Sequence, residues 1–150
     1  MYELVYCSQA KPNMVYEDIL NILKISRERN IKNNITGCLL FYNNQFVQII
    51  EGEKDRVQEL YEKIKTDTRH KNLLLLAQSH KKERHFPNWK MAFQRLKSSD
   101  FENFFDENLI DNFTAFADLA EKPTVTIHFF WSMVKRIIDN DLAKQRFNAV

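Results

Sequence analysis

Glycine is scarce in this chain of 150 residues, which contains only Gly37 and Gly52. With two glycines, no GxGxxG, GxxxxGK(S/T) or GxSxG pattern can be written. At the level of motifs this excludes a dinucleotide-binding Rossmann loop, a P-loop NTPase and a nucleophile elbow.

Residues that form disulfides or bind metals are also few. The two cysteines, Cys7 and Cys38, make neither a disulfide framework nor a zinc site. Each lies in a predicted strand, where a cysteine acts as a small buried apolar residue. The four histidines do not have the spacing of helical metal ligands, so we expect no metal site.

Long apolar runs and a strong net charge are missing as well. No run approaches the ~20 residues of a membrane span, and the N-terminus has no basic region or signal-peptide core. We therefore expect a cytoplasmic protein without a membrane anchor. A formal net charge of +2 is weak, and nucleic-acid binding is not expected as a primary role.

Apolar periodicity predicts strands and helices in a definite order. The expected strands are residues 2–8, 35–42, 46–50 and 72–79, with a short last strand in WKMAFQRL, and the expected helices are residues 15–29 and 55–68. This order is βαββαβ with one extra strand. It predicts an α+β fold of the ferredoxin-like type, with two helices on one face of an antiparallel sheet.

Two segments of the predicted sheet have distinctive patterns. Residues 43–45, Asn-Asn-Gln, read as a polar turn in which asparagine can adopt a positive φ, so the strands on either side form a hairpin. Residues 73–76 are an unbroken apolar run. Such a run is typical of a central strand buried on both faces.

The C-terminal third is expected to cover the second face of the sheet. Several predicted strands are apolar on both faces, so the face away from the two helices also needs a covering layer. Residues 101–120 and a helix at 124–139 are both amphipathic, the latter through Val125, Phe129, Val134, Ile137 and Ile138. We expect residues 1–97 to form the ligand-binding domain and residues 98–150 a helical cap in the same globular unit. The cap also has the character of an oligomer contact or a signal-transmitting element.

Gln48 is a polar residue in the middle of an apolar strand. Side chains alternate along a strand, so Gln48 shares one face with Phe46 and Ile50. A buried amide left unpaired costs about 1–3 kcal/mol, so it needs a partner. The first and third strands are neighbours in this fold, which lets the Tyr6 phenol reach Gln48 if both face the helices. The pair either satisfies itself or also presents a donor to a ligand between the two helices.

Both predicted helices carry polar residues near their C-terminal ends. The stripe on the first helix turns from apolar to polar in the order Ile19, Leu23, Ser26 and Asn30. The second helix ends near Asp67, Arg69 and His70. On composition alone, that second group reads as a solvated helix terminus.

Five segments of residues 2–95 resemble one known family. They are LVYCS, SRERNIKNNITGCLLF, FVQIIEG, KTDTRHKN and FPNWKMAF, in this order. Together they resemble the BLUF domain, a blue-light sensor that uses FAD.

The resemblance implies a non-covalently bound FAD and a light-driven switch. Tyr6 would donate an electron and a proton to the excited flavin, and Gln48 would be the hydrogen-bonded switch beside it. Trp89 and Met91 match the strand that passes the change outward. The residues implied to bind the cofactor are Ser26, Asn30, Phe46, Gln48, Ile64, Asp67 and Arg69.

The implied function is that of a photoreceptor and not of an enzyme. The change would pass to the C-terminal helices and then to a downstream signalling protein, and we also expect a homo-oligomer. Two alternatives remain: a non-photoactive flavin-binding enzyme, and a ferredoxin-like module for another ligand. The loop of residues 8–13 lacks the arginine that an acylphosphatase-like site requires, and no nicotinamide motif is present.

Overall fold

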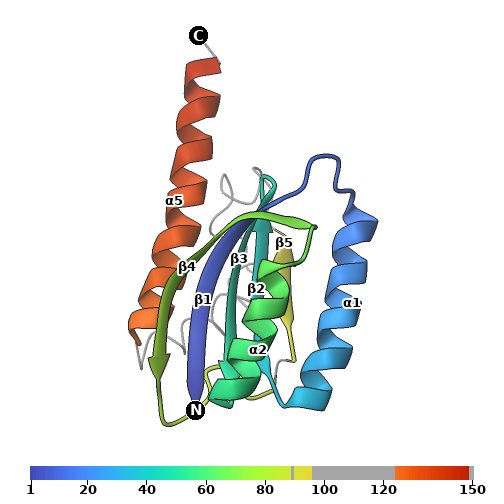
Figure 1. The fold of residues 1–150 in the computed structure, drawn as a ribbon. Helices are drawn as coiled ribbons and strands as arrows, with labels where there is room; N and C mark the ends of the chain where they lie inside the picture. The colour runs from blue at the N-terminus through green and yellow to red at the C-terminus, as the bar shows by residue number, and fades with distance from the viewer. Residues whose placement is uncertain (89, 96–123, 149–150) are drawn as a thin grey trace.

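The computed structural model describes residues 1–88, 90–95 and 124–148. Figure 1 shows a sheet with helices on both of its faces. In chain order the elements are β1 (Tyr2–Ala10), α1 (Tyr16–Asn33), β2 (Thr36–Tyr42), β3 (Gln45–Gly52), α2 (Lys54–Lys65), β4 (His70–His80), β5 (Ala92–Arg95) and α5 (Val125–Asn148).

The five strands lie in the order β4-β1-β3-β2-β5. The first four are antiparallel to their neighbours, whereas β5 pairs with β2 in parallel. The predicted α+β fold of ferredoxin-like type is confirmed, and β5 is its extra strand. This order places β1 beside β3, so Tyr6 and Gln48 lie on neighbouring strands as predicted.

The hairpin of β2 and β3 forms as predicted, with a tighter turn. Asn43 and Asn44 both have positive φ, of 46° and 58°, and Gln45 already belongs to β3. Two positive φ values are the mark of a type I′ turn, whose twist matches that of the paired strands. Gly37 permits the close pairing of the two strands, since a Cβ at this position would lie 2.1 Å from the Ile49 carbonyl oxygen.

The prediction that residues 72–79 form a central strand buried on both faces is wrong. β4 is an edge strand, and the side chains of Leu74 and Leu75 are 56% and 36% exposed. An apolar run reports the preference of a segment for burial but not its place in the sheet, which depends on pairing with distant strands.

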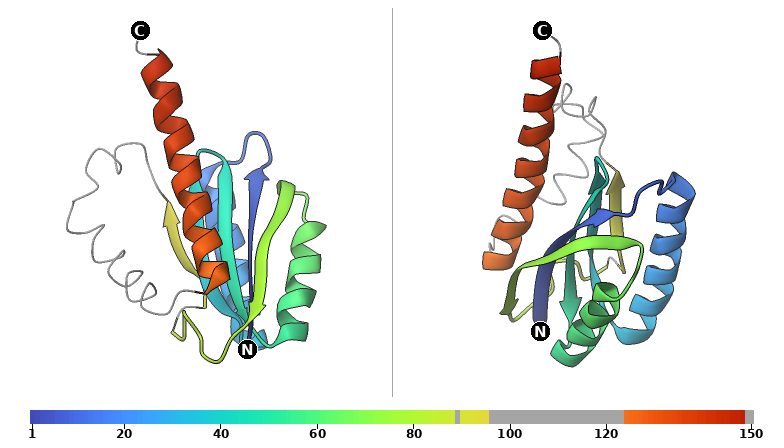
Figure 2. Two further views of the ribbon diagram at one scale, coloured as in Figure 1. Left: turned by 90° about the vertical axis from the view of Figure 1, so that its left-hand side faces the viewer. Right: turned by 45° about the horizontal axis from the view of Figure 1, so that its top comes forward.

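The helices form two layers, with α1 and α2 on one face of the sheet and α5 on the other (Figure 2). The alternation along the central strands follows these layers. Tyr6, Phe46 and Ile50 point into the core under α1 and α2, whereas Val5 and Ile49 point into the core under α5. Gln48 therefore lies on the side of α1 and α2.

α5 covers the second face as expected, but only part of its predicted apolar face is buried. Its buried apolar side chains are Ile127, Phe130, Val134 and Ile137, of which Val134 and Ile137 were predicted. The side chain of Ile138, also predicted, is not among those that the structure describes. Val125 and Phe129, predicted to be part of the apolar face, are 64% and 43% exposed. The amphipathic segment 101–120 and the boundary at residues 97 and 98 lie outside the described residues, so the predicted division into domain and cap stays a prediction.

A buried group of charged residues ties the sheet to the loop after β4. Glu3 and Glu51 are fully buried; the Lys81 ammonium lies 2.6 Å from a Glu3 oxygen and also pairs with Glu51. Glu51 accepts the main-chain N–H groups of His85 at 2.9 Å and Phe86 at 2.7 Å. These bonds compensate for the cost of burying the carboxylates.

The same group reaches the first turn of α5. The Ser79 hydroxyl donates to Glu3 at 3.0 Å and lies 3.0 Å from the Thr126 hydroxyl. The Thr124 hydroxyl lies 3.4 Å from Nε2 of His85. These polar contacts attach the start of α5 to the sheet. Within the described residues, no helix is long and apolar enough to cross a membrane.

Candidate functional site

Tyr6 and Gln48 meet in the core between the sheet and the helices. They are directly opposite each other in the β1–β3 register, and the Tyr6 hydroxyl donates a hydrogen bond to Gln48 Oε1. Tyr6 is fully buried and Gln48 is 6% exposed. Burial raises the pKa of the Tyr6 phenol well above its ordinary value, with Tyr61 and Asp67 adding to the effect. The phenol is therefore protonated at neutral pH and acts as the donor.

The other end of the Gln48 amide faces Met91. Gln48 Nε2 donates to the Met91 sulfur at 3.2 Å, and Met91 is 2% exposed. A thioether is a weak acceptor, so the Gln48 N–H is held less tightly than the Gln48 oxygen. Trp89, the other residue expected to transmit the signal, lies outside the described residues.

Asn30 lies at the end of the helical stripe, and one of its side-chain atoms has no hydrogen-bond partner among the described residues. Its Nδ2 donates to the Lys90 carbonyl at 2.7 Å, and the residue is 1% exposed. Its Oδ1 is buried and receives no hydrogen bond from the described residues. Because a buried acceptor without a donor is costly, this oxygen is the clearest place for a ligand N–H. Ser26 lies one turn earlier on α1 and is partly buried.

Aromatic and aliphatic residues surround these polar groups. Phe46 is fully buried, with its ring centre 4.7 Å from that of Phe41 and 5.1 Å from that of His70. Ile64 on α2 packs against the same core and is partly buried. A few polar groups within an apolar surface are typical of small-molecule sites.

Asp67 and Arg69 lie in the turn after α2 and not on the helix, because α2 ends at Lys65. The Arg69 guanidinium binds Asp67 with a shortest distance of 2.5 Å. Hydrogen bonds from Arg69 hold the pKa of Asp67 below its ordinary value. The two residues thus pair with each other, at the opposite end of β4 from Lys81.

Sequence reasoning did not assign a site role to His70, which the structure places next to the core. Its Nδ1 lies 2.9 Å from the Ser8 hydroxyl. Burial lowers the pKa of His70. Ser8 follows Tyr6 by two residues and therefore lies on the same face of β1. That spacing could have indicated that Ser8, the partner of His70, faces the same core as Tyr6.

Arg27 is a second residue that the sequence did not point to. Its Nε donates to the Met91 carbonyl at 3.2 Å. On the sequence Arg27 is one of several charged residues along α1, and only the approach of residues 90–91 to that helix distinguishes it.

The geometry allows a specific kind of chemistry. A buried phenol is bonded to an amide that has two possible orientations, and the donor end of that amide rests on a weak acceptor. Rotation of the amide would exchange its donor and acceptor ends, so the bonds that it makes depend on which groups lie beside it. The site is therefore suited to a hydrogen-bond switch next to a polar ligand that also meets Asn30 Oδ1.

Comparisons with known proteins agree with this geometry. The family model "BLUF: Sensors of blue-light using FAD" matches residues 1–92. Photoactivated adenylate cyclase subunit beta of Euglena longa is 39% identical over 84 residues, which are 56% of this chain and 10% of that protein. The chain thus spans about a tenth of the length of that relative.

Two solved structures are similar to most of the chain. A bacterial light-regulated adenylyl cyclase superposes with a TM-score of 0.65 and 36% identity, over 81% of this chain and 36% of that one. BlsA in its ground state superposes with a TM-score of 0.63 and 34% identity, over 69% of this chain and 70% of that one. Since the family model covers well over half of the 150 residues, this chain belongs to the BLUF family, the sensors of blue light using FAD.

Proposed function

We propose that this chain is a blue-light photoreceptor that binds FAD non-covalently and uses Tyr6 and Gln48 as its light-driven switch. The observation that supports this most directly is the buried chain of hydrogen bonds from the Tyr6 hydroxyl through the Gln48 amide to the Met91 sulfur. Membership of the BLUF family supports FAD as the cofactor and blue light as the stimulus.

The residues present fit a flavin. Asn30 Oδ1, which has no partner in the part of the chain that the structure describes, offers an acceptor to an N–H of the flavin ring. Gln48 offers a donor if its amide turns away from Met91. Phe46 and Ile64 supply apolar surface for the ring. We also assign Ser26, Asp67 and Arg69 to the cofactor, the last two for its ribityl and phosphate portion. When bound, the flavin absorbs blue light and becomes a strong oxidant.

The protein side of the switch follows from the hydrogen bonds of two residues. Tyr6 would give an electron and its phenolic proton to the excited flavin and would then recover both. In the interval its hydroxyl would no longer donate to Gln48 Oε1. Gln48 then rearranges, by rotation or by a tautomer change. A few hydrogen bonds of about 1 kcal/mol each differ between the two states, so the output needs a neighbouring element with two alternative arrangements.

We propose that this output passes through Met91 and Trp89 to α5 and then to a partner protein. α5 packs on the opposite face of the sheet, and its C-terminal part projects beyond the strands (Figures 1 and 2). Two of the relatives are adenylate cyclases, but the chain covers 36% of the one with a solved structure and 10% of the Euglena protein. We propose that this chain signals without an enzymatic activity of its own. We also propose a homo-oligomer, while the cytoplasmic location stays a prediction.

Absorption spectroscopy of the purified chain with FAD tests the proposal. We expect a flavin spectrum in the dark, a small red shift under blue light and a full return in darkness. A chain that takes up no FAD would support the ligand-binding alternative. A spectrum that bleaches with consumption of a nicotinamide cofactor would support the enzyme alternative.

A further inference from the structure

Lys90 and Met91 lie directly before β5, outside its pairing with the sheet. That pairing begins only after them, at Ala92 opposite Cys38. Among the described strands β5 is at the edge of the sheet, where β2 is its neighbour on one side. Contacts from outside the sheet therefore have a large influence on where Met91 sits.

α1 provides two such contacts. Asn30 Nδ2 donates to the Lys90 carbonyl at 2.7 Å, and Arg27 Nε donates to the Met91 carbonyl at 3.2 Å. Arg27 and Asn30 are three residues apart and so lie on the same side of the helix. A charged donor makes a stronger hydrogen bond than a neutral one. Two adjacent carbonyl groups are thus held by two side chains of one helix.

The position of the Met91 main chain matters because its side chain is adaptable. Methionine has three rotatable bonds and no branch, so packing alone defines its sulfur position poorly. That sulfur accepts the Gln48 N–H at 3.2 Å. Fixing the Met91 carbonyl therefore restricts how far the sulfur can move from the amide that we assign as the switch.

We propose that Arg27 is a positioning residue, whose hydrogen bond to the Met91 carbonyl keeps the Met91 sulfur against Gln48 and thereby sets the lifetime of the light-induced state. The inference rests on the proposed function, because it concerns the same switch. Arg27 acts through Met91, and its side chain has no assigned contact with the cofactor.

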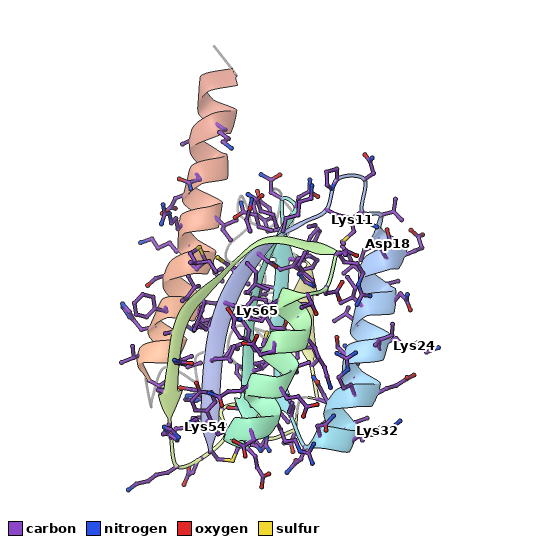
Figure 3. All side chains as sticks on the ribbon, viewed as in Figure 1. Lys11, Asp18, Lys24, Lys32, Lys54 and Lys65 are labelled. Carbon is purple, nitrogen blue, oxygen red and sulfur yellow. The ribbon has the colours of Figure 1, made fainter. Side chains whose placement is uncertain are left out.

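The test compares three variants in the full chain. Arg27→Leu removes the donor, Arg27→Lys keeps a positive donor, and Lys24→Leu is the control. Figure 3 shows the Lys24 side chain on the outer side of α1, directed away from the sheet. Leucine and lysine are good helix formers, so α1 is expected to persist in all three variants.

Two measurements are made on each variant. Arg27→Leu should change the rate of dark recovery by about threefold or more, the scale expected for losing one hydrogen bond. It should also speed amide hydrogen exchange in peptides that cover residues 90–95. Arg27→Lys should lie closer to the wild type in both measurements, and Lys24→Leu should match the wild type.

The outcomes separate this inference from the proposed function. A wild-type photocycle with the same recovery rate and the same exchange in Arg27→Leu would overturn the role of Arg27 alone. A wild type that shows no reversible shift would overturn the proposed function and the control of lifetime with it. Even then, unchanged exchange in Arg27→Leu would remove the anchoring role, and faster exchange would support it.

Discussion

The Tyr6 hydroxyl donates to the side-chain oxygen of Gln48 across the pair of central strands, with both residues buried and directly opposite in register. A second tyrosine on the same strand makes a similar bond, since the Tyr2 hydroxyl donates to Gln78 of β4. What distinguishes the first pair is its surroundings. The Gln48 amide is buried and also meets Met91, whereas Gln78 is exposed on the edge strand β4. The Tyr2–Gln78 pair therefore offers matched controls.

Replacing Tyr6 by phenylalanine is expected to keep FAD bound but to abolish the reversible red shift. The ring volume is preserved, whereas the phenolic proton and the bond to Gln48 Oε1 are lost. The unpaired amide oxygen should lower the free energy of unfolding by about 1–3 kcal/mol. Absorption spectra before and after blue light measure the first effect, and urea unfolding the second. Tyr2→Phe should retain the shift, and a normal photocycle in Tyr6→Phe would remove Tyr6 from its assigned role.

Replacing Gln48 by leucine is expected to abolish the shift and also to move the dark spectrum. The change removes the acceptor of the Tyr6 hydroxyl and the donor to the Met91 sulfur in one step. The control is Gln78→Leu, which removes the partner of Tyr2 and should leave both spectra as in the wild type. If Gln48→Leu kept the dark spectrum and the shift, the switch would have to be another group.

Replacing Asn30 by alanine is expected to weaken FAD binding more than it weakens the fold. Its Oδ1 has no donor among the described residues, so in the absence of ligand only the bond to Lys90 is lost. One hydrogen bond of about 1.4 kcal/mol to the cofactor corresponds to a tenfold change in the dissociation constant. Fluorescence titration of the apoprotein with FAD measures this dissociation constant.

Asn33→Ala is the matched control for this titration. Asn33 lies on the same helix and donates to the main-chain oxygen of Arg29 at 2.9 Å, a bond within α1. Its loss should leave FAD affinity unchanged. Equal affinities in Asn30→Ala and the wild type would contradict the assignment of Asn30 to the cofactor.

Replacing Lys81 by methionine is expected to be strongly destabilising. Lys81 is the shared partner of the buried Glu3 and Glu51 carboxylates, and removing one member of a buried ion pair costs about 3–5 kcal/mol. Lys82→Met changes an exposed neighbour and should have little effect on urea unfolding. A Lys81→Met protein as stable as Lys82→Met would show that the carboxylates are stabilised by their other hydrogen bonds.

The stabilisation by the buried pair of Glu3 and Lys81 is expected to depend on pH. Burial acts to raise the pKa of Glu3, but hydrogen bonds from Lys81 and Thr124 and nearby positive charge outweigh it, so the pKa lies below its ordinary value of 4.5. The folded state therefore binds this proton less tightly than the unfolded state. The stability that the carboxylate provides is present above about pH 4.5 and is lost as the pH falls through the lowered pKa. The difference in unfolding free energy between the wild type and Glu3→Gln should shrink over that acidic range.

Much of the sheet was predictable because it depends on local patterns. Alternation along residues 46–50 placed Gln48 and Phe46 on one face, and the Asn43–Asn44 turn defined the hairpin. The edge position of β4 was not predictable in this way. Leu74 and Leu75 belong to an apolar run, yet their exposure depends on which strands pair with β4.

The site was predictable only in part, for a related reason. The residue types and their family-like spacing pointed to Tyr6, Gln48 and Asn30. The bonds of Asn30 to Lys90 and of Arg27 to Met91 join residues about 60 positions apart. No periodicity in either segment encodes such a contact.

The sequence by itself determined which residues alternate, where the chain turns and which family it resembles, because these depend on neighbouring residues and on motif order. The tertiary structure alone decided that Glu3, Glu51 and Lys81 form one buried group, that Val125 and Phe129 face outward, and that α1 holds the segment of Met91. Those features depend on how elements distant in the sequence pack together, because that packing decides both which side chains are buried and which groups they contact.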